Sequence, residues 1–364
     1  MTRPDTAEPA AAALEQVRRG VDAALERFLN TCAARAPDEC LPPLIEVVRE
    51  FQDGGKRLRP LFCCAGFAAV RGDPADEVAL DVAASLELLH SFALIHDDVM
   101  DGSDTRRGRP TVHRRFGPHV PDQRTAEPRA RAPGADFGVS VAILLGDACL
   151  VWSDELLHHC DVDPRNWAAV RPLVQAMRNE LITGQYLDIA GEGVEEPLER
   201  AWRVIRHKTA AYTVARPLQI GAALAGAEPD LLSGCAEFGF PLGEAFQLRD
   251  DLLGVFGDPA RTGKSTSDDL RAGKPTVLMG LAWRSATADQ RAELRRMHGN
   301  PELDEDGAAR LRGLLDETGA RDRCRELIEA RTETALGALE RMAVSDRARG
   351  MLAELAHRTT HRQR

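Results

Sequence analysis

The spacing of apolar residues constrains the fold of this chain most strongly. Over residues 73–102, apolar side chains recur every three or four positions, as on one face of an α-helix. They are Val78, Val82, Leu86, Leu89 and Ala93. Asp73 and Pro74 are typical of a helix start, and Gly102 is typical of a helix end. A helix of about 28 residues spans about 42 Å. Such a helix can bury its apolar face only against a large helical partner.

The same spacing recurs along most of the chain and predicts an all-α fold. No segment alternates apolar and polar residues for long enough to predict a sheet. The further helical segments are 139–160, 166–190, 198–224, 276–297 and 308–342. We expect residues 1–13 to form a flexible extension and residues 14–364 to form a single helical domain. Residues 117–136 contain four prolines and are expected to form a mobile loop.

The composition argues against several classes of protein. The longest stretch without Asp, Glu, Lys or Arg is eleven residues, which is too short for a membrane span. The N-terminus lacks the apolar block of a secretory signal, so we expect a cytoplasmic protein. A net charge of −10 argues against a general nucleic-acid-binding protein. The eight cysteines include no C-x-x-C pair, so we expect reduced core thiols and no zinc site or redox motif.

Three aspartates at the end of the first predicted helix form an acidic cluster. Asp97, Asp98 and Asp101 are spaced by three and four residues, so their carboxylates can project along one side of the last turn. Two such charges about 5.5 Å apart repel by roughly 3 kcal/mol at an effective dielectric constant of 20. They also lie at the negative end of the helix dipole. The cluster therefore indicates a bound cation, with a solvated acidic helix end as the alternative.

A second cluster contains Gln247, Asp250 and Asp251 on one helix face. Few oxygen ligands per helix suit Mg²⁺, which completes its octahedral shell with water and phosphate oxygens. The alternating acidic loop that binds calcium is absent from the sequence. Two acidic helices of this kind predict a polyphosphate between them.

Lysine is rare here and marks the basic motifs. Of the 47 basic residues only four are lysine, at Lys56, Lys208, Lys264 and Lys274. An ammonium group is a compact, flexible cation that the planar guanidinium cannot replace at every site. The sequence has no G-x-x-x-x-G-K-[ST] motif, which argues against hydrolysis of ATP or GTP. These cations are expected to hold diphosphates in another way.

These motifs together resemble the trans-isoprenyl diphosphate synthases, also called the polyprenyl synthetase family. The resemblance covers roughly residues 50 to 280. It rests on GGKRLRP at 54–60, ELLHSFALIHDDVMD at 87–101, RRGRPTVH at 106–113, GQYLD at 184–188, KTA at 208–210 and FQLRDDLLGVFGD at 246–258. It implies a large helical bundle around a central cavity, and a homodimer.

The resemblance also implies a reaction and a role for each motif. The enzyme would condense isopentenyl diphosphate with an allylic diphosphate and release pyrophosphate, with about three Mg²⁺ ions per site. The metal ligands would be Asp97, Asp98, Asp101, Asp250 and Asp251. The allylic diphosphate would contact Arg106, Lys208, Gln247 and Lys264, of which Arg106, Lys208 and Gln247 would be catalytic. Isopentenyl diphosphate would be held by Lys56, Arg59, His90 and Arg107. Arg57 and Thr209 would also bind substrate, and Lys274 in the 257–275 loop would help to close the site.

One position departs from the family pattern. The second acidic motif often ends in a fifth-position aspartate, where this chain has Gly254. Asp258 and Asp268 are the nearby acids that could partly replace it.

Two residues bear on product length. Phe92, five residues before Asp97, is followed by Ala93, a pattern that looks like synthases of the C20 product geranylgeranyl diphosphate. Filling of the core by Phe92 is the alternative. Farnesyl or longer products, a class I terpene cyclase and a non-catalytic partner subunit are the alternative functions.

Overall fold

The computed structural model describes residues 4–117, 137–191, 198–257 and 266–361. The chain divides into two compact units, each described here by itself. Unit 1 contains Met1–Glu15, Leu61–Pro74 and Val162–Arg364, and unit 2 contains Gln16–Pro60 and Ala75–Asp161. The predicted single bundle with a central cavity concerns both units together and stays a prediction.

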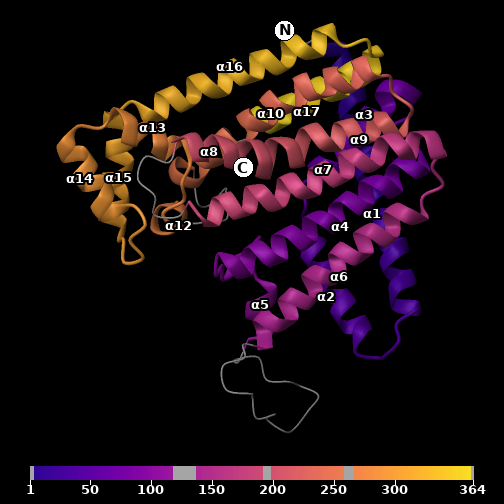
Figure 1. Cartoon of the computed structure of the whole chain (residues 1–364), viewed down its shortest axis with the longest axis horizontal. Helices are drawn as coiled ribbons and strands as arrows, with labels where there is room; N and C mark the ends of the chain where they lie inside the picture. The colour runs from indigo at the N-terminus through magenta and orange to yellow at the C-terminus, as the bar shows by residue number, and fades with distance from the viewer. Residues whose placement is uncertain (1–3, 118–136, 192–197, 258–265, 362–364) are drawn as a thin grey trace. The chain divides into compact units, whose positions relative to one another are not determined.

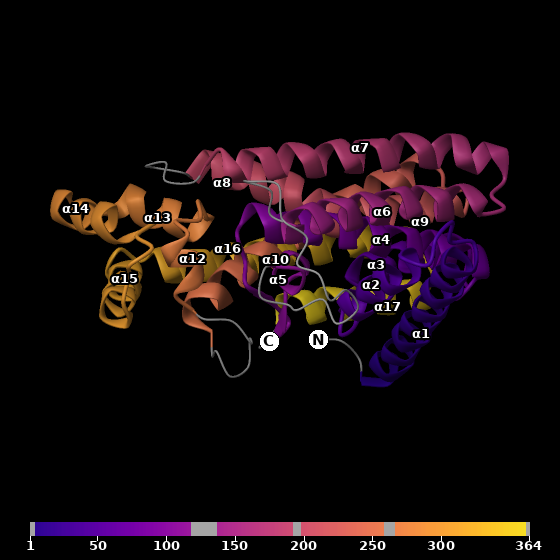
Figure 2. The same cartoon turned by 90° about the horizontal axis from the view of Figure 1, so that it is seen from below.

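Unit 2 is built on two long antiparallel partners, α4 (Glu77–Met100) and α6 (Phe137–His159), which pack against each other (Figures 1 and 2). The side chain of Asp76 caps α4 by accepting hydrogen bonds from the backbone N–H groups of Val78 and Ala79. The other helices of unit 2 are the part of α1 (Pro4–Ala34) that starts at Gln16, α2 (Leu41–Gln52) and α5 (Val112–Arg115). Unit 2 also contains the short antiparallel strands β1 (Thr105–Arg106) and β2 (Arg109–Pro110).

Unit 1 is organised around α10 (Pro229–Phe256), which packs against η1 (Ile205–Ala215) and α16 (Ala320–Arg341). Figure 1 shows α10 and α16 running side by side. The remaining elements are α3 (Leu58–Arg71) from Leu61 on, α7 (Pro164–Ile189), α8 (Leu198–Val204), α9 (Arg216–Leu224), α12 (Asp268–Arg271), α13 (Val277–Ser285), α14 (Ala288–Met297), α15 (Glu305–Glu317) and α17 (Asp346–Thr360).

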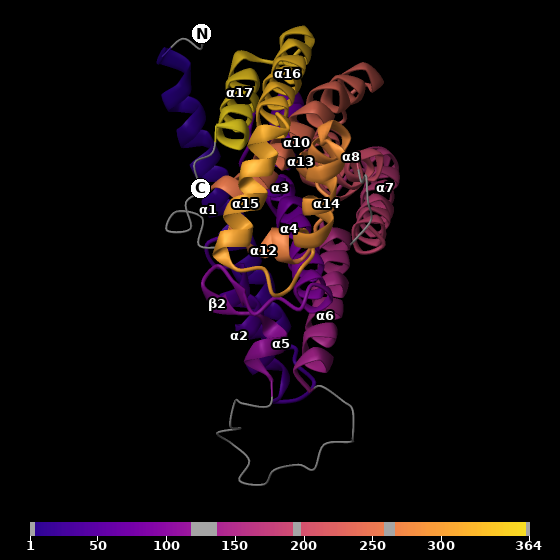
Figure 3. The same ribbon diagram turned by 90° about the vertical axis from the view of Figure 1, so that its left-hand side faces the viewer.

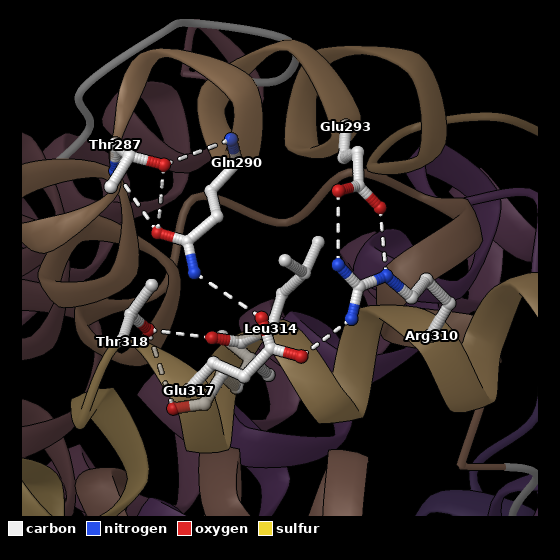
Figure 4. Close-up of polar contacts among 8 residues, drawn as sticks. Thr287, Gln290, Glu293, Arg310, Leu314, Glu317 and Thr318 are labelled. Atoms are coloured by element: carbon white, nitrogen blue, oxygen red, sulfur yellow. Dashed lines mark hydrogen bonds and ion pairs between the residues drawn. The ribbon is translucent and has the colours of Figure 1, made fainter.

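A polar network joins α14 and α15, which lie beside each other in Figure 3. Thr287 and Gln290 form a capping box that starts α14. The guanidinium of Arg310 donates two hydrogen bonds to Glu293, of 2.7 and 2.9 Å, and one to Glu317 of 2.6 Å (Figure 4). Helix α13, which precedes α14, ends at Ser285, and Ala286 and Thr287 are extended. The predicted helix 276–297 is therefore two helices.

The all-α prediction is confirmed, and its main errors concern helix ends. The helix predicted to start near Asp73 begins at Glu77, because Asp76 is the residue whose side chain caps it. The helix predicted over 308–342 breaks at Gly319, whose φ of 71° lies in the left-handed region that favours glycine. The predicted helix 198–224 is continuous but contains the π-helical segment η1.

The N-terminal prediction is corrected for residues 4–13. The structure places them in α1, and Ala10 and Ala13 are buried. Alanine has the highest intrinsic helix propensity, so an alanine-rich segment continues a helix well. Most of the predicted mobile loop at 117–136 lies outside the described residues.

Two helices, α4 and α6, are long and apolar enough to cross a membrane by length and composition. The most apolar window of α4 is 61% buried and that of α6 is 44% buried. Because the two helices pack against each other, much of their apolar surface is buried between helices. They are weak evidence for a membrane span.

The eight cysteines are free thiols. Five are buried, namely Cys63, Cys64, Cys149, Cys235 and Cys324. Burial raises the pKa of the Cys149 thiol to about 12. The predicted reduced core thiols are confirmed for these five, whereas Cys40 is exposed.

Two glycines let α3 and α9 approach within unit 1 until their backbones touch. A Cβ atom added at Gly221 would lie 1.7 Å from the carbonyl oxygen of Cys63, and one at Gly66 would lie 2.1 Å from that of Leu218. Neither backbone oxygen can move away without shifting its helix. The crossing therefore requires both glycines.

We expect Gly221→Ala to destabilise the protein by about 2 to 4 kcal/mol, because the methyl group forces the two helices apart. Gly313→Ala in α15 is the control: its Cβ would meet only Arg310 Nη1, at 3.8 Å. It should stabilise the helix by about 0.5 to 1 kcal/mol. Chemical denaturation measures both changes, and equal stabilities of the two variants would contradict the assigned crossing.

Candidate active site

The three aspartates of the first acidic cluster have different surroundings at the end of α4. Asp98 is buried, and both of its carboxylate oxygens accept hydrogen bonds from Arg106, at 2.7 Å from Nη2 and 2.8 Å from Nε. Asp97 lies 3.9 Å from Arg106 Nη2, and Asp101 is exposed. That all three bind a metal ion stays a prediction. Asp97 and Asp101 are one turn apart, whereas Asp98 holds Arg106.

The β1–β2 turn presents two arginines in fixed orientations. Burial alone would lower the pKa of Arg106, but the hydrogen bonds to Asp98 and the neighbouring acidic charges raise it. Arg107 follows with a φ of 52°, in the left-handed region that is unusual for a residue other than glycine. Its Nη1 donates to the backbone carbonyls of Phe51, at 3.1 Å, and Asp53, at 2.8 Å. Both guanidinium groups keep N–H donors beyond these bonds.

Arg57, which was predicted to bind substrate, is held by two carboxylates in this structure. Its buried guanidinium donates to Asp22 Oδ1 at 2.8 Å and to Glu87 Oε1 at 2.9 Å. A Cβ added at Gly55 would lie 2.6 Å from Arg57 Nη1. The second glycine of GGKRLRP therefore makes room for this ion pair. Arg57 orders the loop, while Lys56 beside it is exposed.

Positive charge surrounds His90 in unit 2. Burial, followed by the charges of Arg59, Arg106, Arg107 and Arg57, lowers the pKa of His90 well below its usual value. The imidazole is therefore neutral at neutral pH. A concentration of guanidinium groups around a neutral imidazole favours a bound anion. This arrangement fits the predicted diphosphate-binding roles of His90 and its neighbours.

A cavity of about 450 Å³ opens beside these groups. Gly54 and four arginines line it, together with acidic and apolar residues of α2. The arginines are Arg106, Arg107, Arg109 and Arg115. The space adjoins the basic motifs of unit 2 and can admit a small anionic ligand.

In unit 1, three glycines bring η1 close to its neighbours. A Cβ at Gly184 of α7 would lie 2.5 Å from the backbone nitrogen of Lys208. Added Cβ atoms at Gly239 and Gly243 of α10 would lie 2.6 Å from the Cα of Ala215 and 2.4 Å from that of Ala210, respectively. These contacts fix η1 between α7 and α10. π-Helical segments are frequent at functional sites.

This packing brings several predicted residues of unit 1 into hydrogen bonds and an ion pair. Thr209 Oγ1 donates to Gln247 Oε1 at 2.7 Å, and Gln247 Nε2 donates to Asp251 Oδ1 at 2.8 Å. Lys208 Nζ lies 2.6 Å from Asp188 Oδ2. Asp188, the last residue of GQYLD, is a partner that the sequence reasoning did not single out. Its place one helical turn after Gly184 in the same motif was the available signal.

The second acidic cluster contains a carboxyl group that favours its neutral form in this structure. Burial, followed by the charges of Asp250, Asp269 and Asp188, raises the pKa of Asp251 to about 8, and the hydrogen bond from Gln247 opposes the shift. Asp250 is exposed. A divalent cation near Asp251 would favour the ionised carboxylate.

The glycine at the fifth position of this motif has an acidic neighbour. A Cβ added at Gly254 would lie 2.3 Å from Asp269 Oδ2. Asp269 thus brings a carboxylate from α12 to the place where a side chain at 254 would begin, and it pairs with Lys274 at 3.4 Å. The suggested replacement Asp268 instead pairs with Arg271 at 3.4 Å. Asp258 and Lys264 lie outside the described residues.

The carboxylates of the two acidic clusters are candidate ligands for Mg²⁺. Carboxylate oxygens are the ligands that Mg²⁺ prefers. Among the described residues, no group of three or more His, Cys, Asp or Glu side chains is gathered tightly enough to hold a metal ion. Since Mg²⁺ is usually bound by one or two carboxylates plus water and substrate phosphates, the residues fit an ion that arrives with a phosphate ligand.

The pKa of Asp251 predicts a pH-dependent stability of the metal-free protein. The folded-state pKa of about 8 lies above the ordinary aspartate value of 3.8, so the stabilising effect is complete below about pH 4 and is lost as the pH rises towards 8. Asp251→Asn removes this loss. Melting temperatures in a chelating buffer should agree near pH 4, with the variant more stable by pH 8. A constant difference across this range would contradict the shift.

The chain was compared with known proteins. Residues 42–312 match the family model described as polyprenyl synthetase. A (2E,6E)-farnesyl diphosphate synthase of Mycobacterium tuberculosis is 34% identical over 315 residues, covering 85% of this chain and 80% of that protein. A geranylfarnesyl diphosphate synthase of Aeropyrum pernix is 33% identical over 332 residues, covering 88% and 93%.

A solved structure is similar over nearly the whole length of the chain. The geranylgeranyl pyrophosphate synthase from Corynebacterium glutamicum, complexed with isoprenyl diphosphate and magnesium, has a TM-score of 0.88 and 40% identity. The similarity covers 96% of this chain and 99% of that chain. Because the family model matches most of the sequence and both comparisons agree with it, the chain belongs to the polyprenyl synthetase family.

Proposed function

We propose that the protein is a Mg²⁺-dependent trans-prenyltransferase, located in the cytoplasm, that joins isopentenyl diphosphate to an allylic diphosphate. The observation that carries the proposal is the cavity lined by four arginines, next to the guanidinium groups that surround neutral His90. A second basic and acidic set, on η1 and α10, supports a second diphosphate. The reaction releases pyrophosphate and yields a prenyl diphosphate longer by one isoprene unit.

In this proposal, the allylic diphosphate leaves as its C–O bond ionises. Asp97 and Asp101 of α4, and Asp250 and Asp251 of α10, would hold about three Mg²⁺ ions, which would stabilise the negative charge on the leaving group. Arg106, oriented by Asp98, donates N–H bonds to the same diphosphate. Lys208, paired with Asp188 in this structure, contributes its ammonium group, and the Thr209–Gln247 hydrogen bond orients the amide. Lys264 is a further proposed contact.

The second substrate is proposed to bind at the basic motifs of unit 2. Lys56, Arg59 and Arg107 hold the diphosphate of isopentenyl diphosphate, and neutral His90 donates a hydrogen bond without adding repulsion to the guanidinium groups. The isopentenyl double bond captures the allylic cation, and released pyrophosphate removes the proton. Exclusion of water prevents the cation from being quenched, and we propose that Lys274 helps to close the site.

We propose that the main product is geranylgeranyl diphosphate. Phe92 lies on α4 before Asp97 and is partly buried, with the small residue Ala93 beside it. A ring at this position would form the floor of an apolar pocket for the growing chain. The relatives are named for farnesyl, geranylgeranyl and geranylfarnesyl products, so their names support the reaction class and leave the length to experiment.

An exposed apolar stripe on α6 supports the proposed homodimer. Phe137, Leu144 and Val151 are 55%, 67% and 62% exposed and recur every seven residues, with Ile143 beside them at 45%. A repeated stripe of this kind is typical of a helix face covered by another chain. Leu144→Glu should produce a monomer in analytical ultracentrifugation, and an unchanged dimer would place the interface elsewhere.

The proposed reaction is tested by supplying both substrates. Purified protein with isopentenyl diphosphate and dimethylallyl, geranyl or farnesyl diphosphate should form elongated diphosphates with Mg²⁺ and none with a chelator. Mass spectrometry gives the chain length from each primer. A hydrocarbon product would instead indicate a terpene cyclase, and no product would indicate a non-catalytic partner subunit.

Replacing Phe92 tests the pocket floor. Phe92→Ala removes the ring and should lengthen the main product by one or more isoprene units. Leu94→Ala, on the same helix, is the control and should leave the distribution unchanged. If both variants give the wild-type distribution, Phe92 fills the core only.

A further inference from the structure

The imidazole of His96 occupies a notch in α6. A Cβ added at Gly146 would lie 2.2 Å from His96 Nε2 and 2.3 Å from its Cδ2. The ring therefore covers the glycine directly, and any side chain at position 146 would take its place. His96 Nε2 also lies 3.1 Å from the backbone carbonyl oxygen of Ile143. Because a carbonyl oxygen only accepts hydrogen bonds, Nε2 is the donor in this contact.

The same imidazole contacts Phe92 one helical turn earlier. The two ring centroids are 4.9 Å apart, with an interplanar angle of 69°, which is an edge-to-face arrangement. Residues four apart on a helix share a face, so α4 presents both rings on the same side. His96 is thus fixed by α6 through the notch at Gly146 and the carbonyl of Ile143. Through the ring contact, it limits the orientations that Phe92 can adopt.

We infer that His96 and Gly146 are positioning residues for product length, because they hold the ring of Phe92 in one orientation. This rests on the proposed function, in which Phe92 is the floor of the product pocket. A ring without the edge contact can turn about its side-chain bonds and give a floor of variable depth. The notch in α6 therefore determines where chain growth stops, although neither His96 nor Gly146 needs to touch the product.

Product distributions test this inference. Gly146→Ala should expel the imidazole and raise the fraction of longer products, by roughly two- to tenfold if the lost ring contact has its usual strength. His96→Ala should do the same, and the double variant should match His96→Ala, since the methyl group then has no ring to displace. Asp147→Ala, which removes only the contact of 3.7 Å between the Asp147 carboxylate and Nε2 and leaves Gly146 in place, is the matched control and should have no effect.

The Phe92→Ala background shows whether the effect passes through Phe92. Once that ring is absent, Gly146→Ala should add no further lengthening. Additional lengthening would overturn the assigned route. A wild-type distribution from His96→Ala would overturn the inference even if Gly146→Ala failed to fold, because that truncation leaves no clash.

A spectroscopic measurement separates this inference from the proposed function. 4-Fluorophenylalanine at position 92 reports the ring environment by ¹⁹F NMR without any substrate. His96→Ala and Gly146→Ala should shift and sharpen the signal, whereas Asp147→Ala should not. An unchanged signal in the first two variants would disprove the positioning role. If the signal changes but the wild-type enzyme forms no elongated product, the proposed function fails and the contact itself stands.

Discussion

Compensation of buried negative charge governs the local arrangement of both acidic clusters. Asp98 is buried and receives two hydrogen bonds from Arg106, so its charge is matched within the protein. Burial, together with the neighbouring carboxylates, raises the pKa of Asp251 to about 8, although the hydrogen bond from neutral Gln247 lowers it. One cluster thus carries its own cation, while the other has an electrostatic demand that an external cation can meet. This difference explains why side chains of the same type have different roles.

Sequence periodicity predicted the helices best where the apolar pattern ended together with the helix. The segments 139–160 and 166–190 correspond to α6 (Phe137–His159) and α7 (Pro164–Ile189). The pattern failed where it continued across a break. The cap at Thr287 and the left-handed Gly319 each divide one predicted helix into two. Apolar spacing reports which face is buried, and it does not record a change of helix direction.

The candidate site was predictable in its residue types and less so in its contacts. The spacing of the three aspartates on α4 is local, so helix geometry was sufficient to group them. Arg57 lay within a basic motif, yet its partners are Asp22 and Glu87, which only the folded chain brings to it. Asp269 approaches Gly254 from another helix. The contact of His96 with Gly146 could not be predicted for the same reason, because Gly146 lies on another helix, α6.

The backbone contact between α3 and α9 sets an order on biosynthesis. Gly66 leaves the ribosome roughly 150 residues before Gly221, a delay of about 7 to 30 s at usual translation rates. Throughout that interval the segment 61–74 has no α9 to cover it, although unit 2 is completed before α9 is made. Nascent α3, with its apolar LFCCAGFAAV sequence, therefore stays uncovered on this face while the second half of unit 2 is synthesised.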